Sequence, residues 1–202
     1  IFNEVRREAP AILCTWWLGS EAGNAICNVL WGDYNPSGKL PMTFPQHNGQ
    51  IPLYYQYKST GRPTALGGWC AKYIDIPTEP AYPFGYGLSY TTFNYSDVKL
   101  LPGDGKGTYT RVAVTVTNTG KCEGEEVVQL YVRDEVASIT RPIKELKGFE
   151  KIKLSPGESK MVTFDVKDEQ LGFYNNQMKF IVEKGDFTLM VGGNSRDLQE
   201  IK

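Results

Sequence analysis

Residues 111–117 read RVAVTVT, and this stretch decides the fold of the second half of the chain. Val112, Val114 and Val116 alternate with polar or small residues. In an extended backbone, every second side chain points to the same face of the strand. The alternation therefore predicts a β-strand with one buried face. Similar alternations recur along the chain, at residues 128–132, 162–166 and 187–191.

Turn sequences separate these runs at regular intervals. Ser155-Pro156-Gly157-Glu158 precedes one run, and Lys184-Gly185-Asp186 precedes another. Three further extended stretches are expected, at residues 93–100, 143–153 and 178–182. About seven short strands of this kind predict an antiparallel β-sandwich of the immunoglobulin or fibronectin type III class, which needs ~100 residues. Residues 91–202 are long enough to form it.

The first 48 residues have a different character. Ala11–Trp16 is a short apolar run that predicts a buried strand. After it, Ser20 is placed to cap a helix, and Gly32 is placed to end it. Apolar residues recur at helical spacing between these two positions: Ala22, Ala25, Ile26, Val29 and Leu30. An extended piece is expected at 39–44. One strand and one helix are too few to cover both faces of a sheet, so we expect this segment to be the tail of a larger α/β domain.

Residues 49–90 form a connector that is unusually rich in aromatic side chains. Eleven aromatic residues lie between Tyr54 and Tyr95, Trp69 among them, which is about twice the chain average of 12%. Flexible linkers are rich in Gly and Ser instead. Because large aromatic side chains are usually buried or form interfaces, we expect the connector to pack against neighbouring structure.

Composition excludes several classes of partner. The chain of 202 residues carries 22 basic and 23 acidic residues, so no net field attracts nucleic acid or anionic lipid. No apolar run approaches the ~18 residues of a membrane-spanning helix. We therefore expect neither a nucleic-acid nor a membrane partner. The chain begins with Ile1 and not with Met, which predicts a cut inside a longer protein.

The sequence offers no convincing set of nucleophile, base or metal ligands. His47 is the only histidine, and it lies beside Asn48-Gly49, a turn sequence. Ser89 lies in GLSYT, which fails the G-x-S-x-G pattern at its last position. Four widely spaced cysteines have no neighbouring histidine pair, so we expect free buried thiols and not zinc ligands. They are Cys14, Cys27, Cys70 and Cys122.

Two carboxylates and a tryptophan pair near the predicted helix are candidate groups for sugar chemistry. Twelve residues separate Glu21 from Asp33, which corresponds to about 18 Å along a helix. Carboxylate pairs that cleave glycosides lie only ~5–9.5 Å apart. We therefore interpret Glu21 as a helix-stabilising residue and Asp33 as a turn residue. Trp16-Trp17 is a candidate platform for a sugar ring, but packing is the favoured interpretation.

Several motifs together resemble family 3 glycoside hydrolases. Residues 17–25 (WLGSEAGNA) and 30–45 (LWGDYNPSGKLPMTFP) resemble the end of that family's α/β sandwich domain, as does IPLYY at 51–55. Residues 82–93 (YPFGYGLSYTTF) resemble the start of its fibronectin type III-like domain, and residues 145–158 are similar to a signature inside that domain. One departure is Leu18-Gly19, where the family commonly has Pro-Gly.

The resemblance implies an organisation and an activity. Residues 1–48 would be the C-terminal remnant of the α/β sandwich domain, 49–90 the packed connector, and 91–202 the fibronectin type III-like sandwich. The parent enzyme would cleave terminal β-glycosides, most often β-glucosides, with retention, and a periplasmic or secreted location is suggested. In the family, the nucleophilic Asp lies in an N-terminal barrel and the acid/base Glu earlier in the α/β domain. No catalytic, cofactor or metal-binding residue is therefore expected in this chain.

The expected role is bracing. The sandwich would support the α/β domain through the aromatic connector, with the barrel and α/β domains as partners and the β-glycoside reached only through them. Residues 1–48 would expose an apolar face, dimerise through it, or be disordered. The alternative is a β-sandwich module that binds carbohydrate or a partner, which a row of coplanar exposed aromatic rings would indicate. An adhesion-type fibronectin module is disfavoured by the α/β motifs.

Overall fold

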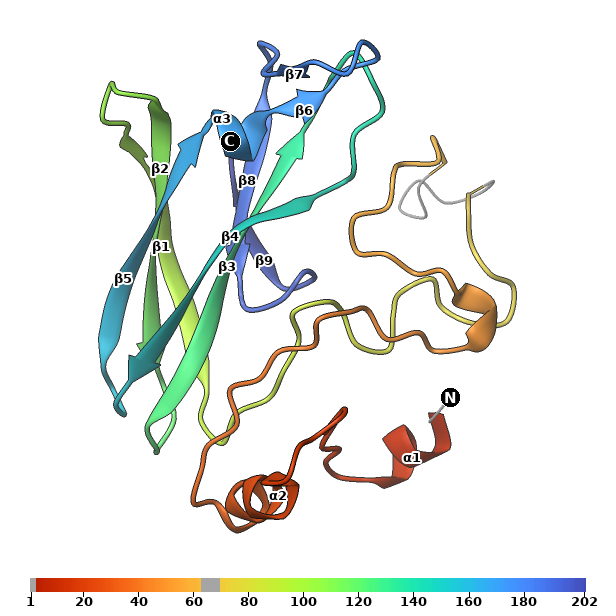
Figure 1. Ribbon diagram of the computed structural model, residues 1–202, viewed down its shortest axis with the longest axis vertical. Helices are drawn as coiled ribbons and strands as arrows, with labels where there is room; N and C mark the ends of the chain where they lie inside the picture. Colours follow the sequence, from red (N-terminus) through yellow and green to blue (C-terminus); the bar gives the residue numbers. More distant parts are fainter. Residues whose placement is uncertain (1–2, 63–69) are drawn as a thin grey trace.

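The computed structural model describes residues 3–62 and 70–202 (Figure 1). Ile1 and Trp69, on which two of the expectations above depend, lie outside the described residues. The C-terminal half forms a β-sandwich, and the N-terminal half runs beside it as short helices joined by long irregular segments. Within the described residues, no helix has both the length and the apolar character needed to cross a lipid bilayer.

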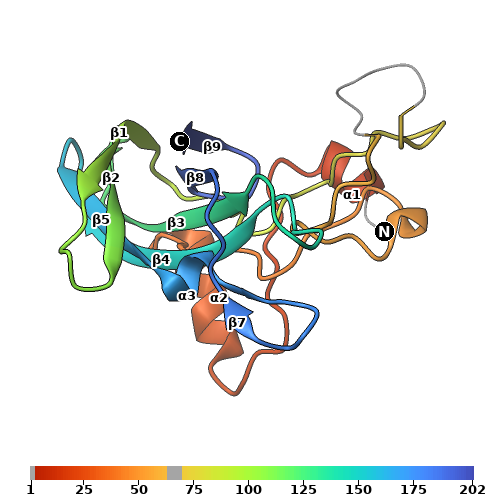
Figure 2. The ribbon, with the colours of Figure 1, turned by 90° about the horizontal axis from the view of Figure 1, so that it is seen from above.

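Two antiparallel sheets pack face to face from residue 93 onward (Figures 1 and 2). One sheet has the strand order β1-β2-β5 and the other β4-β3-β8-β9, and β6 and β7 form a small separate pair. The strands are β1 Phe93–Pro102, β2 Thr108–Asn118, β3 Gly124–Asp134, β4 Glu145–Leu154, β5 Ser159–Lys167, β6 Phe173–Tyr174, β7 Phe180–Ile181, β8 Phe187–Gly192 and β9 Leu198–Ile201. The expected antiparallel sandwich of the immunoglobulin or fibronectin type III class is confirmed.

The alternation in β2 places its valines in the core. Val114 is fully buried and lies opposite Val162 of β5, whereas the next residue, Thr115, lies opposite the exposed Met161 on the outer face. The facing sheet contributes Leu130 of β3, which is 1% exposed. The buried cluster is Val112, Val114, Val116, Val128, Leu130, Val132, Ile152, Leu154, Val162, Val166, Leu171, Leu189 and Val191.

Two strand predictions need correction. The stretch 178–182 was expected to be one strand, but β7 covers only two of its residues. Met178 has φ 58° and its amide donates to the carbonyl of Asn175, so the chain is still turning there. β6 and β9 were not expected, because two and four residues with mixed polarity give little periodic signal.

The helices of the structure are α1 Asn3–Glu8, α2 Ala22–Trp31, α3 Asp168–Leu171 and the 3-10 helix η1 Asn48–Gln50. The predicted helix is therefore present as α2, and Gly32 ends it in the left-handed conformation at φ 84°. The prediction of Ser20 as its cap is wrong. Glu21 occupies the N-cap position, and its carboxylate accepts from the side chain of Asn24 and not from a backbone N–H.

The buried strand predicted at Ala11–Trp16 is absent, and residues 11–16 are irregular. A strand needs a neighbour for its backbone hydrogen bonds, and no strand of the described chain runs beside this segment. The burial predicted for the thiols is also wrong. All four cysteines are free, but Cys14 and Cys27 are exposed, and Cys70 and Cys122 are partly exposed. Cys27 lies on α2, which has no buried residue. Cys14 lies in the irregular segment 11–16, beside which no strand of the described chain runs.

The segment that follows α2 is extended, as expected for 39–44. It runs beside the end of the connector, where Leu40 N donates to Tyr86 O at 2.8 Å and Phe44 N to Tyr82 O at 2.9 Å. The rings of Tyr82 and Tyr86 stack with centroids 5.3 Å apart. Residues 39–44 and 82–86 thus form an irregular two-segment ribbon that leads into β1.

The buried leucine of β3 provides a test of the core. We expect Leu130→Ala to lower the free energy of unfolding by about 2–5 kcal/mol, because it removes buried contacts and leaves a cavity. The matched control is Leu88→Ala, at a site that is 68% exposed, where we expect a change within about 0.5 kcal/mol. Urea denaturation of both variants measures the difference, and equal losses would contradict the core assignment.

Candidate functional site: the junction of the connector with the sandwich

The residues considered for catalysis are placed apart from one another. His47 Nδ1 accepts a hydrogen bond from the backbone N of Gly49, and Ser89 Oγ donates to Asn35 Oδ1 at 2.9 Å. Glu21 and Asp33 lie at opposite ends of α2, as the spacing predicted. Among residues 3–62 and 70–202, no group of three or more His, Cys, Asp and Glu side chains is placed to hold a metal ion. The distinctive arrangement is instead the junction between the connector and strand β3.

The middle of strand β3 is buried on both of its faces. Its core face carries Leu130, and its outer face carries Tyr131 and Gln129, which are 0% and 3% exposed. The connector covers that outer face. The ring of Tyr55 stacks on Phe84 at 4.3 Å and meets Tyr131 edge-on at 5.8 Å. The aromatic connector is therefore packed at these positions, as predicted from its composition.

The side chain of Gln129 ties three segments together. Its Nε2 donates to the carbonyl of Gly85 in the connector at 3.2 Å and to that of Gly193 after β8 at 2.7 Å. Its Oε1 accepts from the hydroxyl of Tyr131 at 2.6 Å. Burial raises the pKa of Tyr131, so this hydroxyl stays a donor. Gly85 has φ 77°, and a Cβ there would lie 2.2 Å from Gln129 Oε1, so only glycine fits this contact.

An ion pair links the N-terminal segment to the end of β3. Lys39 Nζ lies 2.9 Å from Glu126 Oε2, and the two side chains are 14% and 6% exposed. Glu126 Oε1 accepts a second hydrogen bond from the hydroxyl of Tyr95 at 2.8 Å. Burial and the neighbouring carboxylate raise the pKa of Tyr95, which keeps its hydroxyl protonated as the donor. The buried charge of Glu126 thus has a partner on each oxygen.

The turn sequence at 34–37 docks on the same strand. Asn35 Nδ2 donates to the carbonyl of Glu123 at 2.9 Å, and Ser37 Oγ donates to Glu125 Oε2 at 3.1 Å. Lys151 of β4 lies 2.6 Å from the same carboxylate. Hydrogen bonds from Lys151 and then Ser37 lower the pKa of Glu125. Sequence reasoning found this turn but missed its partners, which lie about 88 residues further along the chain.

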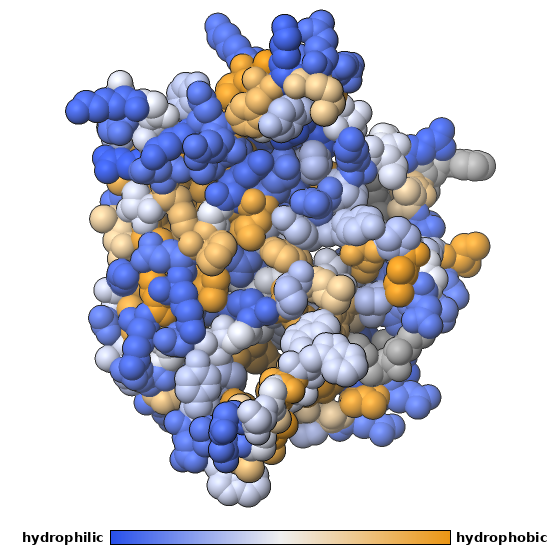
Figure 3. All heavy atoms as spheres, in the orientation of Figure 1, coloured by the Kyte–Doolittle hydropathy of each residue, from blue (hydrophilic) through white to orange (hydrophobic). Residues whose placement is uncertain are grey.

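Residues 1–90 carry most of the exposed apolar side chains of the described structure. Only Ser37, Gln50, Pro83 and Gly85 are buried among the described residues of this half. Trp17 is fully exposed and Trp31 is 80% exposed, while Trp16 contacts Phe44 edge-on at 5.9 Å and stays half exposed. Tyr54, Tyr57, Tyr73 and Tyr90 of the aromatic connector are exposed as well. The space-filling view shows apolar side chains at the surface among polar ones (Figure 3). The expected exposed apolar surface is therefore present.

The sandwich has no aromatic platform on the outer face of its three-stranded sheet. Most described residues that face outward there are polar or small, such as Ser96, Thr115 and Thr163, and the exposed Met161 is not aromatic. Tyr174 and Phe180 are exposed on the β6–β7 pair, but their rings meet at 68° and do not share a plane. This ring pair therefore does not form the coplanar row that the carbohydrate-binding alternative requires.

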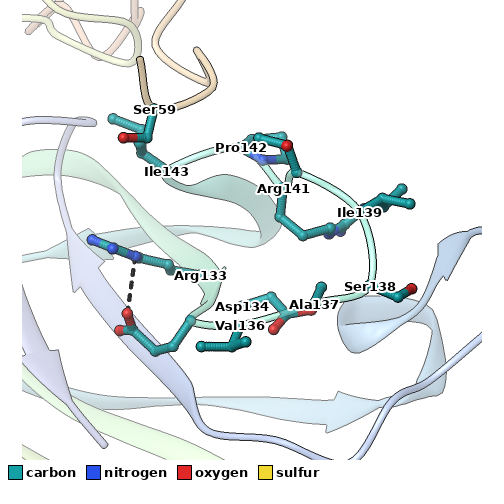
Figure 4. Close-up of a pocket in the computed structure, with 12 residues that line it drawn as sticks. Ser59, Arg133, Asp134, Val136, Ala137, Ser138, Ile139, Arg141, Pro142 and Ile143 are labelled. Carbon is teal, nitrogen blue, oxygen red and sulfur yellow. Dashed lines mark ion pairs between the residues drawn. The ribbon is translucent and has the colours of Figure 1, made fainter. Parts of the chain in front are cut away.

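An open pocket of about 390 Å³ lies inside the loop that joins β3 to β4 (Figure 4). Arg133 pairs with Glu135 at 3.2 Å, and Arg141 pairs with Glu145 at 2.6 Å while lying over the ring of Phe173. Ser59 of the connector closes one side. Asp134 also lines the pocket, and burial raises the pKa of its carboxyl group. Because the two arginines each pair with a neighbouring glutamate, we interpret the pocket as part of the support between loop and connector.

The buried ion pair gives a testable contribution to the junction. We expect Glu126→Gln to lower the free energy of unfolding by about 3 kcal/mol, because Lys39 keeps a buried charge without its counter-ion. Glu150→Gln is the matched control, since Glu150 pairs with Lys160 at 3.2 Å but both side chains are exposed, and we expect a loss below about 1 kcal/mol. Chemical denaturation measures both. A loss at Glu126 no larger than that at Glu150 would show that the pair does not hold the junction.

Comparisons with known proteins agree with this arrangement. Residues 1–90 match the model of the glycosyl hydrolase family 3 C-terminal domain, and residues 126–195 match that of the fibronectin type III-like domain. A periplasmic beta-glucosidase of Salmonella typhimurium is 51% identical over 201 residues, which are 96% of this chain and 26% of that protein. A beta-xylosidase of Formosa agariphila is 46% identical over 198 residues, covering 96% and 26%.

Solved structures show the same likeness. The beta-glucosidase from Listeria innocua in complex with gluconolactone superposes with a TM-score of 0.91 at 42% identity, over 99% of this chain and 28% of that one. The chain thus spans about a quarter of the length of the relatives it matches. Both halves of the chain match in the order that the motifs indicated, and the chain belongs to glycoside hydrolase family 3, whose C-terminal part it resembles along almost its whole length.

Proposed function

We propose that this chain is the bracing, C-terminal region of a retaining, exo-acting β-glycosidase that hydrolyses terminal β-glycosides, with β-glucosides as the main substrates. Within it, residues 1–48 complete an α/β sandwich domain, 49–90 form the connector, and 91–202 form the supporting β-sandwich. The catalytic carboxylates belong to other parts of the enzyme. The names of relatives, among them a beta-glucosidase and a beta-xylosidase, support the substrate class.

One observation carries the bracing role. The described residues of 1–90 bury almost nothing of their own, yet they are held on β3 by the contacts of Gln129, Glu126 and Glu125. Their other side presents apolar residues such as Trp17 and Trp31. Large apolar patches mark interaction surfaces. In the proposal, the rest of the α/β domain packs on this apolar surface. The β-sandwich contacts the opposite side of residues 1–90 and so fixes their position. Dimerisation through the same surface is the expected behaviour of the chain alone.

Such support matters for catalysis because reacting groups must be held accurately. A misplacement of ~1 Å can cost about 10²-fold in rate. Glycoside cleavage with retention needs two carboxyl groups ~5–5.5 Å apart, and their separation depends on how the domains that carry them are seated. The aromatic stack of Tyr55 on Phe84 and the amide of Gln129 are the contacts that would set this seating.

The chain of 202 residues alone should have no glycosidase activity. Because the carboxylates assigned to catalysis lie elsewhere, we expect no hydrolysis of an aryl β-glucoside above the buffer rate. The full-length beta-glucosidase of Salmonella typhimurium serves as the positive control in the same assay. Turnover by the isolated chain that survives repurification would place a catalytic pair within it and would contradict the proposal.

The bracing role is tested in the full-length enzyme that contains this region. We expect Tyr55→Ala to lower both kcat/KM and the melting temperature, because it removes the stack on Phe84 and the edge contact with Tyr131. Tyr109→Ala is the matched control, since Tyr109 is 59% exposed on the sandwich and its hydroxyl bonds only Asp168 among the described residues; we expect no change in kcat/KM and at most a small loss of melting temperature. A truncation after Pro45 should give a larger loss than either. Unchanged kcat/KM in both Tyr55→Ala and the truncated enzyme would remove the bracing role.

A further inference from the structure

The dipeptide Asn48-Gly49 lies in an exposed turn of the connector. It is the single Asn-Gly pair in the sequence. Asn48 opens η1, and His47, Asn48 and Gly49 are all exposed. A side-chain amide followed by glycine is chemically special, because the next backbone nitrogen can reach the amide carbon when no Cβ hinders it. The neighbouring residues decide whether this reaction proceeds.

The structure places a base on the attacking nitrogen. The backbone N of Gly49 donates its hydrogen bond to His47 Nδ1 at 3.1 Å. A general base must lie within hydrogen-bond reach of the proton that it removes, and this imidazole does. A Cβ at position 49 would meet only His47 Nδ1, at 3.4 Å, so the site is otherwise open.

We propose that Asn48 is a self-modification site, at which His47 promotes cyclisation of the side-chain amide onto the Gly49 nitrogen. The proton of Gly49 N–H passes to His47 Nδ1, and the nitrogen forms a bond with Cγ of Asn48. The bond from Cγ to Nδ2 then breaks, and the leaving group takes a proton back from the imidazolium and departs as ammonia. Water opens the resulting cyclic imide at either carbonyl. The products are aspartate and isoaspartate, so the balance is one water consumed and one ammonia released.

The modification acts on a tightly held part of the connector. Gln50, two residues on, is 2% exposed. Its Oε1 accepts from the backbone N of Gln46 and of His47, and its Nε2 donates to the carbonyl of Pro77 at 3.0 Å. Isoaspartate adds a methylene to the backbone between His47 and Gln50. The closed loop of hydrogen bonds around Gln50 cannot keep its geometry with that extra length, so the modified chain has a loosened connector.

Ageing of the full 202-residue chain at neutral pH tests the proposal. Peptide mapping by mass spectrometry, with an isoaspartyl-specific methyltransferase, should show conversion at Asn48. Asn194 is the internal control, because its Oδ1 accepts from the backbone N of Arg196 and of Asp197, and we expect it to stay intact. The native chain should convert faster than the chain in urea, since unfolding removes His47 from Gly49. Slower conversion of the native chain would mean that the fold protects Asn48 and would overturn the proposal.

Two substitutions assign the roles. His47→Asn offers an amide oxygen as acceptor for Gly49 N–H in place of the basic imidazole nitrogen, so we expect conversion to fall by about 10-fold or more. Gly49→Ala hinders the nitrogen and should nearly abolish conversion. Circular dichroism checks that each variant is folded before ageing. An undiminished rate in His47→Asn would exclude the imidazole as base, and an undiminished rate in Gly49→Ala would exclude cyclisation.

Discussion

Burial of β3 on both faces is the constraint on which the rest of the structure depends. A strand of a β-sandwich normally has one solvent-exposed face. The outer face of β3 instead carries the buried side chains of Tyr131 and Gln129, which the connector covers. Buried polar groups must be hydrogen-bonded, and Gln129 satisfies this with carbonyls from the connector and from the segment after β8. Around Tyr55, Phe84 and Gly85 the chain is therefore packed directly on the sandwich.

The contacts at this junction divide into two kinds. Aromatic stacking of Tyr55 and Phe84 removes apolar area from water. The ion pair of Lys39 with Glu126 adds little net stability, because desolvation offsets most of the Coulomb attraction, but it penalises any docking that leaves the charge of Glu126 unpaired. The first kind holds the layers together, and the second selects one register of the N-terminal segment on β3. A bracing element needs both.

The sequence was most informative where burial is decided locally. The alternation at Val112, Val114 and Val116 is enough to identify a half-buried strand, and Gly32 is enough to end α2. It misled at Ala11–Trp16, where an apolar run resembles a buried strand but no neighbouring strand of the described chain pairs with it. The same lack of a covering layer explains why Cys14 and Cys27 are exposed and not buried. Apolar character predicts that a segment will be covered, but not by which surface.

By itself the sequence determined the sandwich, the helix α2 and the family, because each depends on local periodicity, on turn residues or on contiguous motifs. Only the tertiary structure decided which face of β3 receives the connector, that Gln129 binds Gly85, and that Lys39 meets Glu126 across 87 positions of sequence. Such pairings depend on where distant segments are brought by the folded sheets. The residues around a position do not reveal such a distant partner. A glutamine on a strand has the same local sequence whether its amide is hydrogen-bonded to water or to the backbone of another segment.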